Sequence, residues 1–370
     1  MTSFDILDYI EKNKELVLTN NSRYCIDFKE KDHITKLIFG VPIKYKSNNK
    51  IVSPVLVEFN QSFVFCGSDS TITIKNNNYQ FRKQDTIIDL FIDDVFEQCH
   101  DNTVQNRLSI VHPTLNGMKY TVNANKFVFR MKVNIAFDLR VNDRTITIIK
   151  DEFVPILTVS CLGAYGVKNE FLGIAQIIYK KVPDGFECTV FSPFAETKKI
   201  EFEVNAFEEK MFLDTTVESK NVYMNNVYGS LAVIGRSNQF GEQILYTKLL
   251  SNEFLDLSPN RIKSIKLYYS KYVDSSGQLI LCQLASNFCS LGATWNNKIE
   301  TNLGTLYAHH IGPYFCIDIT DVIVENSFSF ISGFPYILKA NTESNSLIPI
   351  NTGDSYVASP FVCVDYYDNI

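Results

Sequence analysis

The sequence has no excess of basic residues and no apolar run long enough to cross a bilayer. Its 370 residues include 35 Lys and Arg against 41 Asp and Glu, which gives a formal net charge of −6. Nucleic-acid binding depends on clustered Lys and Arg, so this composition predicts no nucleic-acid partner. A transmembrane helix needs about 20 apolar residues, and Asp5, Asp8 and Glu11 interrupt the segment where a signal peptide would lie. We therefore expect no membrane span and no secretory signal.

Motifs of catalysis and metal binding are equally scarce. There are five His, and the sequence contains no HExxH, no Walker A loop, no strand-anchored GxGxxG and no G-x-S-x-G. His309 and His310 are adjacent, so on a strand they point to opposite faces and cannot share a metal. We expect no catalytic residue, no metal site and no cofactor. A carboxylate pair for polysaccharide hydrolysis stays open, because 41 acidic residues offer many such pairs.

The sequence also lacks a CxxC motif, and its nine cysteines are an odd number that cannot all pair. Most of them lie beside apolar or strand-like neighbours, as in Phe65-Cys66 and Val362-Cys363-Val364. We interpret them as small buried side chains of a chain that folds in a reducing compartment.

Alternation of apolar and polar residues dominates what is present. Between Phe127 and Val141 every odd position is apolar, whereas the even positions are mostly polar or small. A strand places such residues on one face of a sheet, so the segment predicts one long strand of a half-solvated antiparallel sheet. Asn142-Asp143 predicts the turn that follows, since both residues tolerate positive φ, and the alternation resumes at Ile146.

Other strand-like runs, such as 186–190 and 262–269, are separated by turn residues. Many short strands with regularly spaced turns are typical of sandwiches and barrels. Residues 2–20 differ, because their apolar residues recur at helical spacing and predict a short N-terminal helix. We therefore predict an all-β fold of two or three antiparallel β-sandwich or jelly-roll domains behind this helix.

The length indicates more than one domain. At about 150 residues per domain, the chain makes two or three. No Pro- or Gly-rich linker marks a boundary. The predicted domains are 1–105, which includes the leading helix, then 106–210 and 211–370. The alternative is that residues 1–105 and 106–210 form a single domain.

Several short motifs follow one another in the last third of the chain. In order they are Asp214-Thr215-Thr216-Val217, an Asn-rich loop at 221–226, Tyr228-Gly229-Ser230, the strand 262–269, Thr294-Trp295-Asn296-Asn297, Ile317-Asp318-Ile319-Thr320 and Ser359-Pro360-Phe361. This order resembles the DNRLRE family over residues 214–367. An Arg-containing strand of that family has no counterpart near 243–257, and residues 1–210 show no resemblance.

The resemblance implies a jelly-roll-like β-sandwich module of bacterial surface proteins, some of which bind carbohydrate. A sugar ring has an apolar face that stacks on aromatic side chains. Trp295 and Tyr268 are therefore candidate glycan contacts, with Asn296 and Asn297 as hydrogen-bonding neighbours. For Trp295, the only Trp, packing in the core is the alternative. On its strand we expect Tyr269 to face the core and Tyr268 the outside.

Together these expectations describe a non-catalytic structural or attachment protein of an extracellular assembly, such as a phage or phage-tail-like particle. Such a virion component folds in the cytoplasm, which suits the unpaired thiols. Its partners would be other structural proteins of the assembly and a cell-surface glycan. Multiple copies raise avidity, so we expect a homo-oligomer. Two alternatives stay open: a carbohydrate-binding protein of a bacterial cell surface, and a polysaccharide-degrading enzyme.

Overall fold

Antiparallel strands make up most of the structure. The computed structural model describes residues 17–21, 25–30, 33–39, 45–46, 50–51, 56–59, 62–66, 70–75, 78–83, 85–92, 96–100, 103–114, 117–150, 154–207, 210–250, 257–299, 302–326, 333–341, 347–356 and 358–368. The helices among them are short: α2 (Thr320–Asn326), η1 (Pro259–Arg261) and η2 (Trp295–Asn297). The predicted all-β fold is thus confirmed. Within these ranges no helix has the length and apolar character to cross a membrane.

The predicted N-terminal helix falls mainly on residues 1–16, which lie outside the described residues. Residues 17–21 form a strand. Backbone contacts divide the chain into two compact units, residues 1–43 with 209–370 and residues 44–208. The predicted domain boundaries near 105 and 210 stay predictions.

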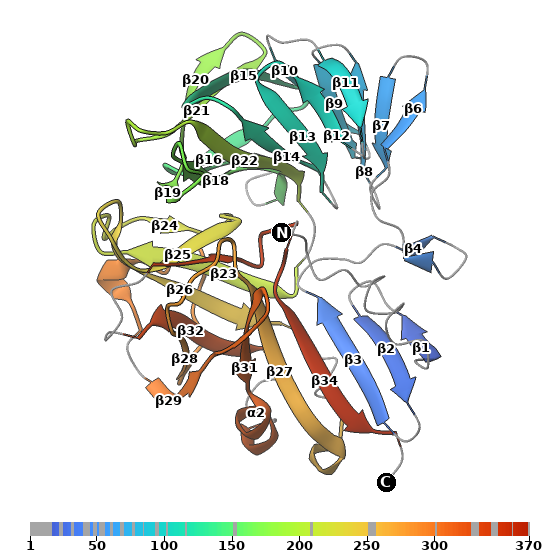
Figure 1. Ribbon diagram of the computed structural model, residues 1–370, viewed down its shortest axis with the longest axis vertical. Helices are drawn as coiled ribbons and strands as arrows, with labels where there is room; N and C mark the ends of the chain where they lie inside the picture. The colour runs from blue at the N-terminus through green and yellow to red at the C-terminus, as the bar shows by residue number, and fades with distance from the viewer. Residues whose placement is uncertain are drawn as a thin grey trace. The chain divides into compact units, whose positions relative to one another are not determined.

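The first unit contains a seven-stranded sheet that joins the two ends of the chain (Figure 1). In spatial order its strands are β1 (Val17–Asn21), β2 (Cys25–Glu30), β3 (His33–Phe39), β34 (Phe361–Tyr367), β27 (Ile262–Ser270), β31 (Tyr314–Asp318) and β30 (His309–Ile311). β3 pairs with β34 from His33 opposite Tyr367 to Phe39 opposite Phe361. Figure 1 shows this as blue strands beside a red one.

The second sheet of this unit has eight strands. They are β24 (Asn225–Asn226), β23 (Phe212–Glu218), β26 (Gly241–Leu249), β32 (Phe334–Ala340), β28 (Leu279–Leu284) and β29 (Asn302–Tyr307). In addition, β25 (Leu231–Ser237) pairs with β26, and β33 (Ile348–Asn351) pairs with β25. All its pairings are antiparallel.

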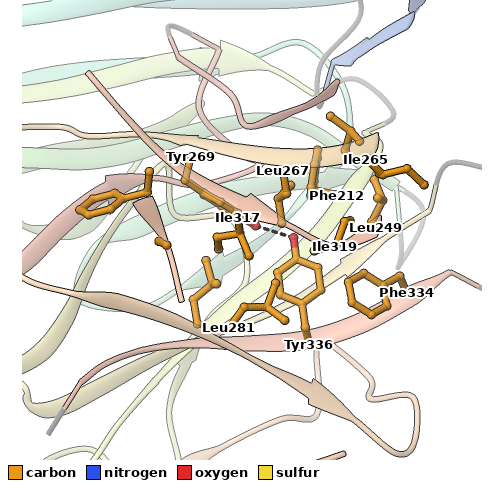
Figure 2. Packing of buried hydrophobic residues seen from close by; sticks show 14 of the residues in the cluster. Phe212, Leu249, Ile265, Leu267, Tyr269, Leu281, Ile317, Ile319, Phe334 and Tyr336 are labelled. Atoms are coloured by element: carbon orange, nitrogen blue, oxygen red, sulfur yellow. Dashed lines mark hydrogen bonds between the residues drawn. The ribbon is translucent and has the colours of Figure 1, made fainter. Parts of the chain in front are cut away.

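Both sheets of the first unit contribute side chains to one hydrophobic core. Leu267 and Ile317 come from the seven-stranded sheet, and Leu281 and Phe334 from the other (Figure 2). Burial of this apolar surface, at roughly 25 cal/mol per Å², is the main stabilising contribution. The core also contains polar atoms, since the Tyr269 and Tyr336 hydroxyls hydrogen bond at 2.8 Å. The predicted facing of Tyr269 toward the core is confirmed.

Residues 44–208 form two further large sheets. One contains β20 (Gln176–Val182), β21 (Gly185–Phe191), β15 (Lys126–Val133), β10 (Thr86–Ile92), β9 (Asn78–Lys83), β8 (Ser70–Lys75), β7 (Ser62–Cys66) and β6 (Leu56–Phe59). The other contains β11 (Phe96–His100), β12 (Thr103–Asn106), β13 (Ser109–Pro113), β14 (Gly117–Val122), β22 (Lys199–Ala206), β18 (Val154–Tyr165), β17 (Thr145–Lys150), β16 (Asp138–Val141) and β19 (Phe171–Ile174). A separate pair is β4 (Tyr45–Lys46) with β5 (Lys50–Ile51). Rings of Phe129 from the first sheet and Phe202 from the second stack at 5.6 Å.

The predicted single strand from Phe127 to Val141 is wrong. It is two strands, β15 and β16, which belong to different sheets. Asn134 ends β15, because its Oδ1 accepts the N–H of Ile87 at 2.8 Å and its Nδ2 donates to the Asp85 carbonyl at 3.2 Å. These side-chain bonds take the place of the backbone hydrogen bonds that would continue the pairing of β15 with β10. The chain then crosses to the other sheet.

The predicted hairpin at Asn142-Asp143 is confirmed, although for a different reason from the one expected. β16 and β17 pair across this turn, yet neither residue has positive φ. Instead Asn142 Oδ1 accepts the N–H groups of Arg144 and Thr145 at 2.8 and 2.7 Å. This is an Asx-type turn, in which the side chain mimics a backbone carbonyl.

Most of the described cysteines are buried, as predicted. The buried ones are Cys25, Cys161, Cys188, Cys282 and Cys316. Cys289 is exposed and does not fit the prediction.

Candidate functional site

The eight-stranded sheet of the first unit also carries apolar residues on the face opposite the main core. Val217, Ile244, Cys282 and other side chains form a second, smaller cluster there. Residues 285–299 lie against this cluster. Tyr246 of β26 holds them, because its ring lies 5.3 Å from that of Phe288 and its hydroxyl donates to the Ile299 carbonyl at 3.1 Å.

Trp295 belongs to this covering loop and not to the main core. It is half-buried against the smaller cluster. The Lys298 ammonium lies 4.3 Å from the centroid of the Trp295 ring, a cation–π contact. The indole therefore anchors the loop, and one of its faces is already engaged.

The two candidate asparagines have different roles in this loop. Asn297 Oδ1 accepts the backbone N–H and the hydroxyl of Thr294 at 2.7 and 2.9 Å, and its Nδ2 donates to the Gly292 carbonyl at 3.0 Å. These bonds shape the short helix η2. The backbone N–H of Asn296 donates to the carbonyl of Val222 at 3.0 Å. The Asn296 side chain is exposed.

A second loop, residues 219–226, lies beside the first. Asn225 Nδ2 donates to the carbonyls of Leu291 and Ala293 at 3.0 and 2.8 Å and reaches that of Ser290 at 3.4 Å. Together with the Val222–Asn296 bond, these contacts join loops about seventy positions apart in the sequence. We call the exposed residues Tyr223, Met224, Leu291 and Asn296, together with the half-buried Trp295, the two-loop surface.

The two-loop surface exposes large apolar side chains beside amides. Tyr223 is 78% exposed, Leu291 42% and Met224 38%. Tyr223 was not among the residues predicted from the sequence. The signal available for it was the Asn-rich loop at 221–226, because Asn favours turns and connecting loops lie on the protein surface.

Tyr268 does not belong to this surface. It lies on the seven-stranded sheet, half-buried on the face away from the core, where its ring stacks on Phe361 at 4.8 Å with an interplanar angle of 3°. Tyr314 meets it edge-on at 6.1 Å. Burial raises the pKa of Tyr268, and a hydrogen bond with Cys316 adds to the shift. The structure thus groups Trp295, Asn296 and Asn297 and places Tyr268 on another sheet.

Replacing Asn225 by Ala is expected to loosen residues 286–299. The substitution leaves carbonyls of the loop without their donor, so we expect amide hydrogen exchange there to accelerate by about tenfold. Hydrogen–deuterium exchange with mass spectrometry measures this. Asn296→Ala is the matched control, because its backbone N–H and not its side chain bonds Val222. Equal exchange in both variants would contradict the role given to Asn225.

Among the residues that the structure describes, no three His, Cys, Asp or Glu side chains are grouped as metal ligands. No protein-family model matches the chain, and no curated protein matches its sequence. The resemblance to the DNRLRE family therefore depends on its motifs alone.

Proposed function

We propose that the chain is a non-catalytic attachment protein of an extracellular assembly, such as a phage or phage-tail-like particle, and that it binds a cell-surface glycan. In this proposal residues 211–370 form a DNRLRE-like jelly-roll β-sandwich. Its support is the shared core of two antiparallel sheets, which is the arrangement that sandwiches have. The buried thiols support folding in a reducing cytoplasm before release.

The observation that carries the glycan-binding proposal is the exposure of Tyr223 next to the Trp295 loop. A largely solvated phenol ring offers a flat apolar face for a sugar ring. Asn296 beside it offers an amide that both donates and accepts hydrogen bonds, as sugar hydroxyls require. The loop-to-loop hydrogen bonds fix this arrangement before a ligand arrives, which lowers the entropic cost of binding.

The experiment compares three variants with the unmodified protein on a printed array of bacterial polysaccharides. Tyr223→Ala is expected to weaken binding by about tenfold or more, as aromatic contact residues commonly do. Trp295→Ala should weaken it as well, through loss of the loop anchor. Tyr307→Ala is the matched control, because this tyrosine is 54% exposed on β29, outside the two-loop surface.

Two outcomes would contradict the proposal. Absence of binding to every polysaccharide on the array would argue against glycan recognition. Binding that survives both Tyr223→Ala and Trp295→Ala would reject the two-loop surface, and Tyr268→Ala would then test the other sheet. Light scattering on the same preparations tests the homo-oligomer, since avidity in attachment requires several copies.

A further inference from the structure

Three charged side chains come together inside the first unit. The side chains of Lys210 and Asp354 are 7% and 6% exposed, and Asp214 is 3% exposed. Lys210 Nζ forms an ion pair with Asp354 Oδ1, and the carboxyl group of Asp214 is close enough to that of Asp354 for the two to interact electrostatically. Buried charges of this kind are costly unless they are paired or perform chemistry.

The backbone around the cluster holds these groups in place. Asp214 Oδ2 accepts the N–H of Gly353 at 2.6 Å. Gly353 lies so close to β23 that an added Cβ would come within 2.6 Å of the Phe212 Cβ, so no larger residue fits there. Ser230 Oγ donates to the Asp354 carbonyl at 3.1 Å. Asp214 and Ser230 belong to the sequence motifs at 214–217 and 228–230, and these motifs therefore meet at the cluster.

Burial and the neighbouring charges set the protonation of this cluster. Burial raises the pKa of Asp214 well above its usual range, and the neighbouring Asp354 adds to the shift, which favours the protonated carboxyl group. For Lys210, burial disfavours the ammonium, but Asp354 outweighs burial and the pKa is raised. The pairing therefore holds Lys210 as an ammonium, and the amine becomes a nucleophile only after it passes a proton to the carboxyl group that it contacts.

We propose that Lys210 and Asp354 condense into an intramolecular amide cross-link, with Asp214 as the acid that assists the reaction. The Lys210 Nζ lone pair attacks Asp354 Cγ, and a C–N bond forms. Asp214 donates a hydrogen bond to the carboxyl oxygen that becomes negative. The C–O bond then breaks, and the oxygen leaves with two protons as one water molecule. An ammonium and a carboxylate thus give an amide and water, so no oxidant or other reactant is required.

The contact between Lys210 and Asp354 provides the effective concentration that this reaction lacks in free solution. Two reacting groups held in contact behave as if at very high concentration. The bond would join residues 144 positions apart, from just before β23 to the turn before β34. It would lock most of the first unit into one covalent loop, whether or not the two-loop surface binds glycan.

The test is the intact mass of the full chain, purified under reducing conditions and measured after denaturation. The unmodified protein is expected to be lighter than its sequence by one water molecule. Lys210→Arg and Asp354→Ala should keep their full mass, and Asp214→Asn should slow or abolish the loss. Proteolytic mapping should recover the peptide with Lys210 joined to the peptide with Asp354.

A full sequence mass of the folded unmodified protein after prolonged incubation would overturn the proposal. So would a mass loss that persists in Lys210→Arg, because a succinimide at Asp184-Gly185 also releases one water. These readouts hold even if a variant folds poorly, since the unmodified chain and its peptide map decide the question.

Discussion

Phe202→Ala is expected to lower the free energy of unfolding of the 44–208 unit by about 3–5 kcal/mol. Phe202 is fully buried. Its ring stacks on Tyr120 at 4.6 Å with an interplanar angle of 2° and on Phe129 at 5.6 Å with an angle of 6°. Truncation removes a ring that contacts both sheets and leaves a cavity that neighbouring rings fill only in part.

Urea titrations can separate this effect from the other unit, because the only Trp lies in residues 209–370. Far-ultraviolet circular dichroism follows both units, whereas Trp295 fluorescence follows the first alone. Phe202→Ala should lower the midpoint of one dichroism transition and leave the fluorescence midpoint unchanged. Phe315→Ala, at a buried residue of the first unit, is the matched control. It should lower the fluorescence midpoint and leave unchanged the dichroism transition that Phe202→Ala shifts. Equal shifts of both probes in Phe202→Ala would contradict independent units.

Local alternation in the sequence predicted the strand content but not the sheet to which each strand belongs. The segment 127–141 shows why. Ile135 and Phe137 keep the alternation while the chain leaves one sheet for another, because they remain half-buried in the crossing. Phe137 lies 5.9 Å from Phe186, so its apolar character is explained without a strand. Only the hydrogen bonds of Asn134 reveal the break, and these depend on residues near position 86.

Long-range pairing also escaped prediction. β3 lies beside β34, although more than 300 positions separate them. No local sequence pattern identifies such a partner strand. Each of the two strands could pair with any strand whose apolar side chains face the same side of the sheet. The candidate site shows the same limit. Thr294-Trp295-Asn296-Asn297 was recognisable in the sequence, whereas Tyr223 is brought to it by the hydrogen bonds of Asn225 and by the Val222–Asn296 bond.

The core of the first unit should also make it sensitive to alkali. Burial raises the pKa of Tyr269 and that of Tyr336 (Figure 2). The folded protein thus holds these phenol protons more tightly than the unfolded chain does. The resulting stabilisation is complete below the unfolded pKa of about 10 and is lost as pH rises toward the folded values. Each such phenol contributes about 1.4 kcal/mol of lost unfolding free energy per pH unit in that range.

Tyr336→Phe is therefore expected to have opposite effects at neutral and at alkaline pH. Near pH 7 it should destabilise the unit by about 1 kcal/mol, since Tyr269 loses its 2.8 Å partner and keeps only Thr247 at 3.4 Å. Above about pH 10 it should reduce the slope of unfolding free energy against pH by about 1.4 kcal/mol per unit, because one titrating phenol is gone. Urea titrations followed by Trp295 fluorescence measure both effects. Tyr223→Phe, on an exposed ring, is the matched control, and an unchanged slope in Tyr336→Phe would show that this phenol does not couple to folding.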